Sequence, residues 1–254
     1  MRLDKFVSHA TGASRSQVHQ WLRQRRISLN GTPCTQAAQK ITDDSTVYLD
    51  AEPISLPSEG YWLLHKPSGV VCANRDAHHP TVIDLVSHSL APDNLQIAGR
   101  LDADTTGMVL ITTDGDWNHQ VTAPKKHCQK IYRVHLSTPL TAQAQQQLRA
   151  GILLHGETKP CLPADLYALT PLEYLLGIYE GKYHQVKRMM AAVGSQVVGL
   201  HRLGIGGLCL NGLACGEFRP LTAAEISQLA SHPQTLDLAQ LAQTLLPAPT
   251  ASPN

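Results

Sequence analysis

The sequence predicts an α+β protein with a small N-terminal α/β domain and a main domain built on a mixed, largely antiparallel β-sheet flanked by helices. Segments typical of strands outnumber segments typical of helices and do not alternate with them, which argues against a parallel βαβ design. A stretch at residues 51–60 carries two prolines and a glycine. Such composition is typical of a linker between a head and a body.

Length and composition are compatible with this division. The chain has 254 residues, of which 43% are hydrophobic, so it can bury one large core or two unequal ones. We expect domains at residues 1–56 and 57–232. The segment 233–254 is short of aromatic residues and rich in Ala, Pro, Gln and Thr, and we expect it to be a disordered tail.

Cysteine usage and the first residues bear on the compartment. The six cysteines form no Cys-x-x-Cys pair, so they resemble scattered reduced thiols more than a disulfide framework or a zinc site. The N-terminal stretch lacks the apolar run of a signal peptide, and no segment approaches the length of a membrane span. We therefore expect a cytoplasmic protein. We also expect it to be a monomer.

The net charge of +1 conceals an asymmetry. Residues 1–40 carry seven Lys or Arg and one acid, whereas residues 59–254 carry fourteen Lys or Arg and fifteen acids. A helix at residues 14–26, capped by Ser14, would place basic side chains on one stripe: Arg15, His19, Arg23 and Arg26. The stripe is either an ordinary solvated face or a surface that follows the phosphates of a nucleic acid.

The remaining elements follow from local patterns. In the head, an Asn-Gly turn within 27–34 predicts a hairpin, and 45–50 is a further strand. Alternation and β-branched residues predict strands in the body at 61–66, 70–73, 95–99, 107–113, 128–136 and 174–179. Caps and apolar spacing predict helices at 142–150, 185–193 and 223–230. The glycines of 204–212 predict a hairpin with a bulge.

The acidic loop "GRLDADTTG" at residues 99–107 leads into one of these strands. Asp102 and Asp104 stand one residue apart, as in the Asp-x-Asp pairs that hold divalent metals in many sugar-nucleotide transferases. Asp side chains also bond the backbone of their own turn. The loop could therefore bind a metal, present a nucleophile, or form a well-bonded turn.

The segment "EGKYHQVKRMMAAVG" at 180–194 combines a core face with cations. Val186, Met189 and Met190 share one helical face, as core residues do. Lys187 and Arg188 then fall near the first turn, where cations oppose the helix dipole, so a carboxylate or a phosphate is expected nearby. For the adjacent His184, a structural hydrogen-bonding role is the more common alternative to a functional one.

The segment "PKKHCQKIYRV" surrounds Tyr132 with basic residues, including Lys130 and Arg133. A ring between cations suits a nucleic-acid surface, because the ring can stack on a base. Lysines on an exposed edge strand, which discourage pairing with other chains, are an equally good explanation of this segment alone.

Taken in order, these motifs resemble a known family. "GRLDADTTGMVLITTDG" resembles the signature loop of pseudouridine synthases, in the branch with an Arg-Leu-Asp core. "HKPSG", "KIYRV" and "EGKYHQVKRMMAAVG" resemble the family's other motifs, in the expected order. "SRSQVHQWLRQRRISLNG" is similar to the small RNA-binding domain named after ribosomal protein S-four. The resemblance extends from residue 1 to about residue 230, and no family motif matches the segment from Pro233.

The resemblance implies an isomerase that converts a specific uridine of small-subunit ribosomal RNA, free or in an assembly intermediate, to pseudouridine. Asp102 would be the catalytic carboxylate and Lys187 its basic partner. Tyr132 would pack on the target base, and Arg100 would help to hold the nucleotide out of the stack. The resemblance implies no metal, nucleotide or other cofactor.

Other residues receive weaker roles. Asp104 and the threonines after it are expected to shape the loop, without a partner for Asp104 in the other motifs. Four cations are candidates for RNA contact or for support of the site: Lys66, Lys130, Lys182 and Arg188.

Two other functions stay open from the residues alone. A metal-dependent glycosyl or phosphoryl transferase would use Asp102 and Asp104, and would need a nucleotide-binding α/β half. A non-catalytic RNA-binding protein would keep the basic head, but would gain nothing from an acid that faces a cation in a second domain.

Overall fold

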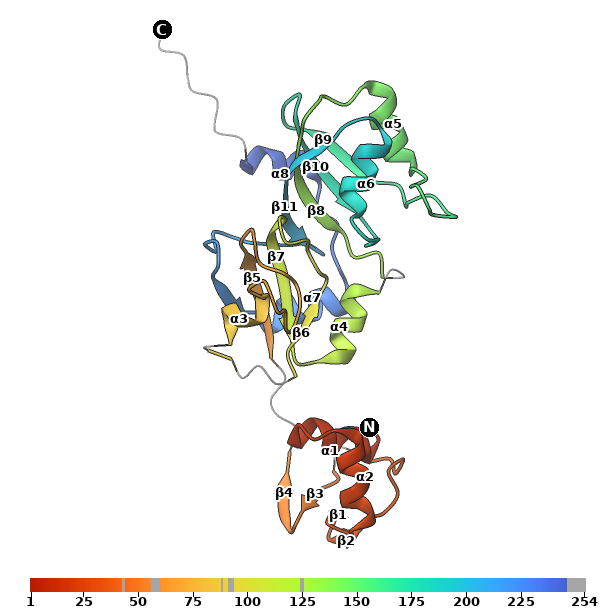
Figure 1. Cartoon of the computed structure of the whole chain (residues 1–254), viewed down its shortest axis with the longest axis vertical. Coiled ribbons are helices and arrows are strands. Elements are labelled where there is room, and N and C mark those ends of the chain that lie inside the picture. The colour runs from red at the N-terminus through yellow and green to blue at the C-terminus, as the bar shows by residue number, and fades with distance from the viewer. Residues whose placement is uncertain (43, 56–59, 88, 91–93, 124–125, 246–254) are drawn as a thin grey trace. The chain divides into compact units, whose positions relative to one another are not determined.

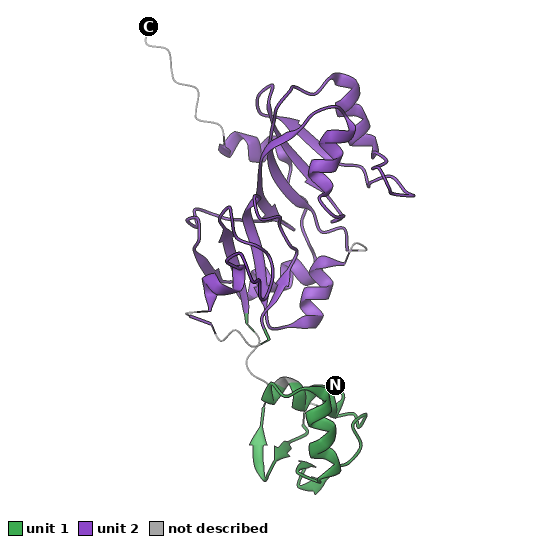
Figure 2. Cartoon of the chain, viewed as in Figure 1, with its two compact units in different colours: residues 1–60, 92–94 green, residues 61–91, 95–254 purple. Residues whose placement is uncertain are grey.

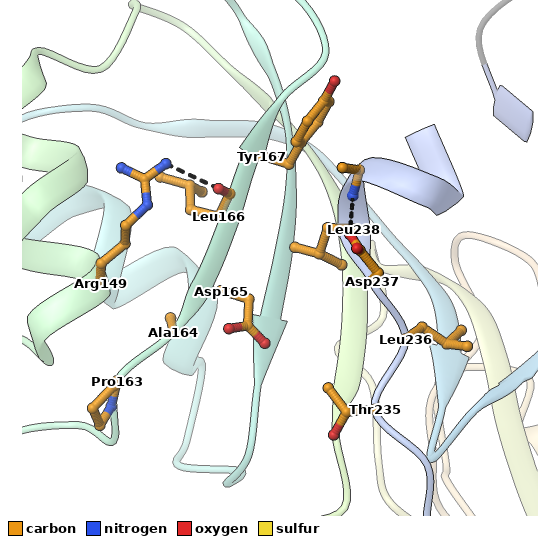
Figure 3. A pocket seen from close by; sticks show the side chains of 11 residues that line it. Arg149, Pro163, Ala164, Asp165, Leu166, Tyr167, Thr235, Leu236, Asp237 and Leu238 are labelled. Atoms are coloured by element: carbon orange, nitrogen blue, oxygen red, sulfur yellow. Dashed lines mark hydrogen bonds between the residues drawn. The ribbon is translucent and has the colours of Figure 1, made fainter. Parts of the chain in front are cut away.

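The computed structural model describes residues 1–42, 44–55, 60–87, 89–90, 94–123 and 126–245 (Figure 1). The chain forms two compact units, residues 1–60 with 92–94 and residues 61–91 with 95–254 (Figure 2). The expected boundary at residues 56 and 57 lies outside the described residues, and the units divide at Gly60 and Tyr61.

The first unit is an α/β domain, as the sequence predicts. Its helices are α1 (Leu3–Thr11) and α2 (Arg15–Arg23). Its sheet has the order β2-β1-β3-β4, with strands β1 (Ile27–Leu29), β2 (Thr32–Pro33), β3 (Val47–Leu49) and β4 (Glu52–Ile54). The Ser14 side chain caps α2 by accepting from the Gln17 N–H. Asn30 and Gly31 both have positive φ, which a tight hairpin turn requires.

The basic stripe of this unit differs from the prediction at its end. Helix α2 stops at Arg23, and Arg25 takes a left-handed conformation. Arg26 therefore lies beyond the helix, where it forms an ion pair with Asp50 and its guanidinium stands 5.4 Å from the centre of the Trp21 ring. The expected helical stripe is reduced to Arg15, His19 and Arg23.

The second unit contains a nine-stranded sheet of order β13-β5-β7-β11-β8-β10-β9, in which β12 also pairs with β11 and β6 with β7. The strands are β5 (Tyr61–Lys66), β6 (Gln96–Ala98), β7 (Thr106–Thr112), β8 (Lys130–Leu136), β9 (Asp165–Ala168), β10 (Glu173–Ile178), β11 (Val197–Ile205), β12 (Leu208–Cys209) and β13 (Phe218–Pro220). Among the described strand pairs of this sheet, β7 and β11 are parallel and the others are antiparallel. The sheet is thus mixed and largely antiparallel, as predicted, and the β11–β12 hairpin turns on Gly206 and Gly207.

In the part of this unit that the structure describes, six helices flank the sheet: α3 (Val82–Val86), α4 (Gly115–Thr122), α5 (Ala142–Ala150), α6 (Gln185–Ala192), α7 (Ala223–Ser231) and α8 (Leu238–Leu245). Side-chain alternation along β8 and β10 separates two cores. Tyr132 and Val134 face the core that contains α5 and α6, whereas Ile131 and Leu175 face α8. None of the helices in the described part of the chain is long and apolar enough to cross a membrane.

The expected return strand at residues 70–73 does not form. Strand β5 pairs instead with β7 and β13, and Val71 makes only an isolated bridge to Thr81. The reason is the buried amine of Lys66, which donates to the carbonyls of Pro67 (2.8 Å), Val70 (2.7 Å) and Ala103 (3.1 Å). These bonds tie the turn after β5 to the acidic loop rather than to a hairpin partner.

The predicted disorder from Pro233 is wrong for residues 233–245. Leu238 and Ala242 of α8 are buried in a core with Ile131 and Leu175. The backbone N–H of Leu236 also donates to Gln129 Oε1 (2.9 Å). Leucines spaced three and four residues apart give this polar-looking segment an apolar face that covers the sheet. Residues 246–254 lie outside the described residues.

Candidate active site

The acidic loop is held in place by Arg202 of β11, a side chain that is 2% exposed. Its guanidinium donates to the carbonyls of Met108 (2.7 Å), Gly99 (2.8 Å) and Arg100 (3.4 Å). Residue 107 must be glycine, because its φ is +111° and an added Cβ would lie 2.3 Å from the Arg202 carbonyl oxygen. Strand β11 thus fixes both ends of the turn that carries Asp102.

Asp102 faces two side chains from the start of α6. Its Oδ2 lies 2.9 Å from Lys187 Nζ, and its Oδ1 lies 3.3 Å from His184 Nε2. Lys187 belongs to the first turn of α6, where the sequence required a nearby anion. The structure confirms that expectation and supplies Asp102 as one such anion.

Asp104 is the second anion, which corrects the expectation that it lacks a partner. Lys187 Nζ donates to its Oδ1 (2.7 Å) and Oδ2 (2.9 Å). This hydrogen bond lowers the pKa of Asp104. Burial lowers the pKa of Lys187, but the hydrogen bonds to Asp104 and Asp102 outweigh it, so the pKa is raised above its ordinary value. One ammonium group therefore serves both carboxylates of the loop.

Asp102 lines a cavity of about 500 Å³. Tyr132 of β8 lines the same cavity, and its hydroxyl lies 3.5 Å from Arg202 Nη1. Leu200 and Ile178 supply apolar lining, and Arg100 lies exposed at the loop. The cavity thus combines a carboxylate beside a cation with a buried aromatic ring and an apolar wall.

The four weaker candidate cations are not equivalent. Lys66 is 0% exposed, and in the described residues its amine bonds to the three carbonyls given above, so it offers no surface to RNA and supports the loop. Burial lowers the pKa of Lys66. Lys130 lines the same cavity as Asp102, is half-buried, and burial lowers its pKa as well.

Lys182 and Arg188 brace a neighbouring loop. Glu157 lies 3.4 Å from Lys182 Nζ and 3.1 Å from Arg188 Nη1. Arg188 also donates to the carbonyls of His155 (2.8 Å) and Tyr183 (3.1 Å). Both cations therefore join residues 155–157 to the segment around the start of α6, and Lys182 also lines the cavity.

The third basic segment does not form an edge. Strand β8 lies between β11 and β10 in the sheet, so edge protection cannot explain its cations. Arg133 pairs with Glu173 on β10 at 3.0 Å. Tyr132 points instead into the core beside the cavity.

The predicted residues of the first unit lie on exposed surface. Arg15, His19 and Arg23 are exposed on α2. His19 Nε2 lies 3.9 Å from Asp4, the single acid of the first forty residues, which also pairs with Arg2 at 2.7 Å. Arg15 and Arg23 remain as exposed cations of the helix.

Sequence reasoning missed two residues of the site. Arg202 stands in the strand "VVGLHRLGI", and a lone cation in an apolar strand was the available signal. His184 was weighed mainly as a structural histidine, yet it contacts Asp102. In the described residues, no three or more His, Cys, Asp or Glu side chains gather in a way that could hold a metal ion.

Comparison with known proteins identifies the family. Residues 60–192 match the model of the RNA pseudouridylate synthase family, and residues 1–47 match the S4 domain. The chain belongs to the RNA pseudouridylate synthase family. This match covers the acidic loop, Tyr132 and Lys187.

The relatives of this synthase match nearly from end to end. This chain is 45% identical over 231 residues to the ribosomal small subunit pseudouridine synthase A of Haemophilus influenzae. The matched region covers 90% of this chain and 99% of the relative. The enzyme of the same name from Escherichia coli K12 is 44% identical, with 90% and 100% covered. A crystal structure of a pseudouridylate synthase is 42% identical, with a TM-score of 0.66 and with 90% of this chain and 99% of that chain covered. The resemblance read from the motifs is thus confirmed.

Proposed function

We propose that this synthase isomerises a specific uridine of small-subunit ribosomal RNA to pseudouridine, with Asp102 as the catalytic carboxylate. The observation that carries the proposal is the contact between Asp102 and Lys187 at the wall of the cavity that Tyr132 also lines. The names of the full-length relatives support the choice of RNA.

The reaction needs no co-reactant besides the RNA. The bond between N1 of uracil and C1′ of ribose breaks, the base turns, and a bond forms between C5 and C1′. The C5 proton leaves and N1 regains a proton, so atoms and electrons balance. The catalyst must hold a detached base next to its sugar and stabilise the charge that develops on breaking the bond.

The target base must leave the RNA stack before its glycosidic bond can be reached. The cavity of about 500 Å³ has room for a base, and Tyr132 offers a ring for the base to pack on. Arg100 is exposed close to Asp102 in the loop. There its guanidinium can bind a phosphate, or fill the space that the extruded base leaves in the stack.

Asp102 then acts from the cavity wall. Attack on the sugar, attack on the base and removal of a sugar proton all begin with an ionised carboxylate. The ammonium of Lys187 lies 2.9 Å from Asp102 Oδ2 and holds the carboxylate at the cavity wall. Because Asp104 keeps a second bond to Lys187, the cation stays in position when Asp102 reacts.

The first unit supplies affinity in this proposal. Exposed Arg15 and Arg23 on α2 suit a surface that follows RNA phosphates. We propose that the enzyme works as a monomer, on free RNA or an assembly intermediate, in the cytoplasm where ribosomal RNA is assembled.

The test is to incubate the full chain with small-subunit ribosomal RNA and map isomerised uridines, with and without a chelator. One discrete pseudouridine, formed equally in both arms and lost in Asp102→Asn, is the expected result. Absence of pseudouridine, or activity that only a divalent metal restores, would overturn the proposal.

A further inference from the structure

Tyr183 is a large ring that the fold leaves exposed at the edge of the catalytic cavity. It lines the cavity together with His184, and 75% of its surface is accessible. Among the described residues, the other large exposed hydrophobic side chains are Met1, Leu153 and Val198. Tyr183 is thus the one aromatic member of this set, and it stands at the entrance to the site.

One face of the Tyr183 ring is already covered. The ring stacks on His184 with a centroid distance of 3.8 Å and an angle of 19° between planes. The same imidazole approaches Asp102, with 3.3 Å between Nε2 and Oδ1. Since most of the residue is still accessible, the opposite face of Tyr183 is open to solvent.

The backbone around Tyr183 is fixed in an unfavourable conformation. His184 has a φ of +47°, a region that costs an ordinary residue about 1–2 kcal/mol. Arg188 Nη1 donates to the Tyr183 carbonyl (3.1 Å), and the Lys182 N–H donates to Gln185 Oε1 (2.8 Å). The stacked pair is therefore held ready before a ligand arrives, which lowers the entropy lost on binding.

Extrusion of the target uridine creates a need that this ring can meet. When a base leaves the stack, its neighbour in the strand loses a stacking partner on one side. A flat aromatic surface replaces that partner, and base–aromatic stacking is worth about 1–3 kcal/mol for any base. Because Tyr183 lines the same cavity as Asp102 and is 75% accessible, its open face is available to the strand whose uridine enters that cavity.

We propose that Tyr183, backed by His184, is the stacking platform for the base of the nucleotide adjacent to the target uridine. This inference rests on the proposed function. It assigns Tyr183 to a binding subsite and not to the chemistry, and because every base has an aromatic face, the subsite takes any of the four bases.

The test compares Tyr183→Ala with Tyr183→Phe on an RNA whose target uridine has been mapped with the unaltered enzyme. Stacking at 1–3 kcal/mol corresponds to a loss of about 5- to 150-fold in kcat/KM for Tyr183→Ala. We expect that loss to fall mainly on KM, and Tyr183→Phe to stay within about twofold because the ring remains. Val198→Ala, which trims another exposed apolar side chain, is the matched control and should change neither constant.

A second measurement identifies the nucleotide that stacks on the Tyr183 side chain. RNA affinity is measured in the Asp102→Asn background, which binds without turnover, with abasic nucleotides placed on either side of the target. An abasic site at one neighbour should weaken binding to the Tyr183-containing protein and have no further effect once Tyr183→Ala is present. The inference would be overturned if the abasic site and Tyr183→Ala weakened RNA binding additively at both neighbouring positions. It would also be overturned if Tyr183→Ala bound RNA as tightly as the protein with Tyr183, or if Tyr183→Phe lost as much affinity as Tyr183→Ala. Failure of the proposed function is distinct, because the unaltered enzyme would then form no pseudouridine.

Discussion

At the residue scale, a single ammonium group organises the acidic loop. Lys187 Nζ lies 2.9 Å from Asp102 Oδ2 and 2.7 Å from Asp104 Oδ1. The two acids differ in exposure, since the Asp104 side chain is 70% exposed and Asp102 is 27% exposed. The more buried carboxylate lies in the cavity wall, and the outer one holds the shared cation.

The first prediction separates these roles. Asp102→Asn keeps the shape of the side chain but removes its charge and nearly all of its nucleophilicity, so isomerisation should be abolished while RNA affinity stays within about twofold. Asp104→Asn leaves the Asp102–Lys187 contact in place and should retain measurable activity. Single-turnover assays on mapped RNA measure both. If both variants are inactive and added magnesium governs the unaltered enzyme, the loop is a metal site.

The second prediction concerns alkaline pH. The bond to Asp104 helps to raise the pKa of Lys187, so removing that carboxylate should lower it. A lysine with a lower pKa loses its proton at lower pH, and the cation beside Asp102 disappears earlier. In Asp104→Asn, the alkaline limb of the profile of kcat/KM against pH should therefore shift to lower pH. An unshifted limb would mean that another group sets it.

The sequence could predict Asp102, Tyr132 and Lys187 because each sits in a motif whose order along the chain resembles the family. It could not predict Arg202, because strand alternation does not tell which cation lies inside. Burial of that guanidinium depends on three carbonyls contributed by residues about a hundred positions earlier. Only the folded sheet brings β11 under the acidic loop.

At the scale of elements, the sequence predicted helix starts correctly where a capping residue marked them. The caps at Ser14, Thr141 and Thr222 each accept a backbone N–H at the predicted helix start. The prediction of a return strand after β5 was wrong because the amine of Lys66 bonds the turn. The local sequence pattern does not reveal these bonds. Helix α8 was missed because composition outweighed the spacing of its leucines.

The third prediction follows from the helix α8 that replaces the disorder expected from Pro233. Truncation after Ser231 removes Leu238 and Ala242 from the face of Ile131 and Leu175. Burying one leucine contributes about 1.5–3 kcal/mol, and each 1 kcal/mol lost lowers the melting temperature of a chain this size by about 2–4 °C. A calorimetric scan should therefore show a fall of roughly 5 °C or more.

The matched control is truncation after Leu245, which keeps α8 whole. It should melt within about 2 °C of the full chain, the scale of a change below 1 kcal/mol. Equal melting of both truncations and the full chain would mean that α8 adds nothing to the stability of the sheet.

At the scale of the whole molecule, the two units divide binding from chemistry in the proposed function. The cavity and every residue that contacts Asp102 belong, among the described residues, to the second unit. The first unit carries seven Lys or Arg in its first forty residues. Its ion pairs show which of these cations are already engaged, a distinction that sequence charge alone could not make.

The fourth prediction uses this distinction. Removing residues 1–60 should weaken RNA binding and flatten its dependence on salt, because each lost phosphate contact reduces the slope of log K against log salt by about 0.7–0.9. Within the intact chain, Arg15→Ala with Arg23→Ala should reproduce part of this change. Arg26→Ala is the matched control, since Arg26 is already paired with Asp50 and should affect the slope less. Titrations at several salt concentrations measure all four proteins, and a slope that survives loss of the first unit would place the phosphate contacts in the second.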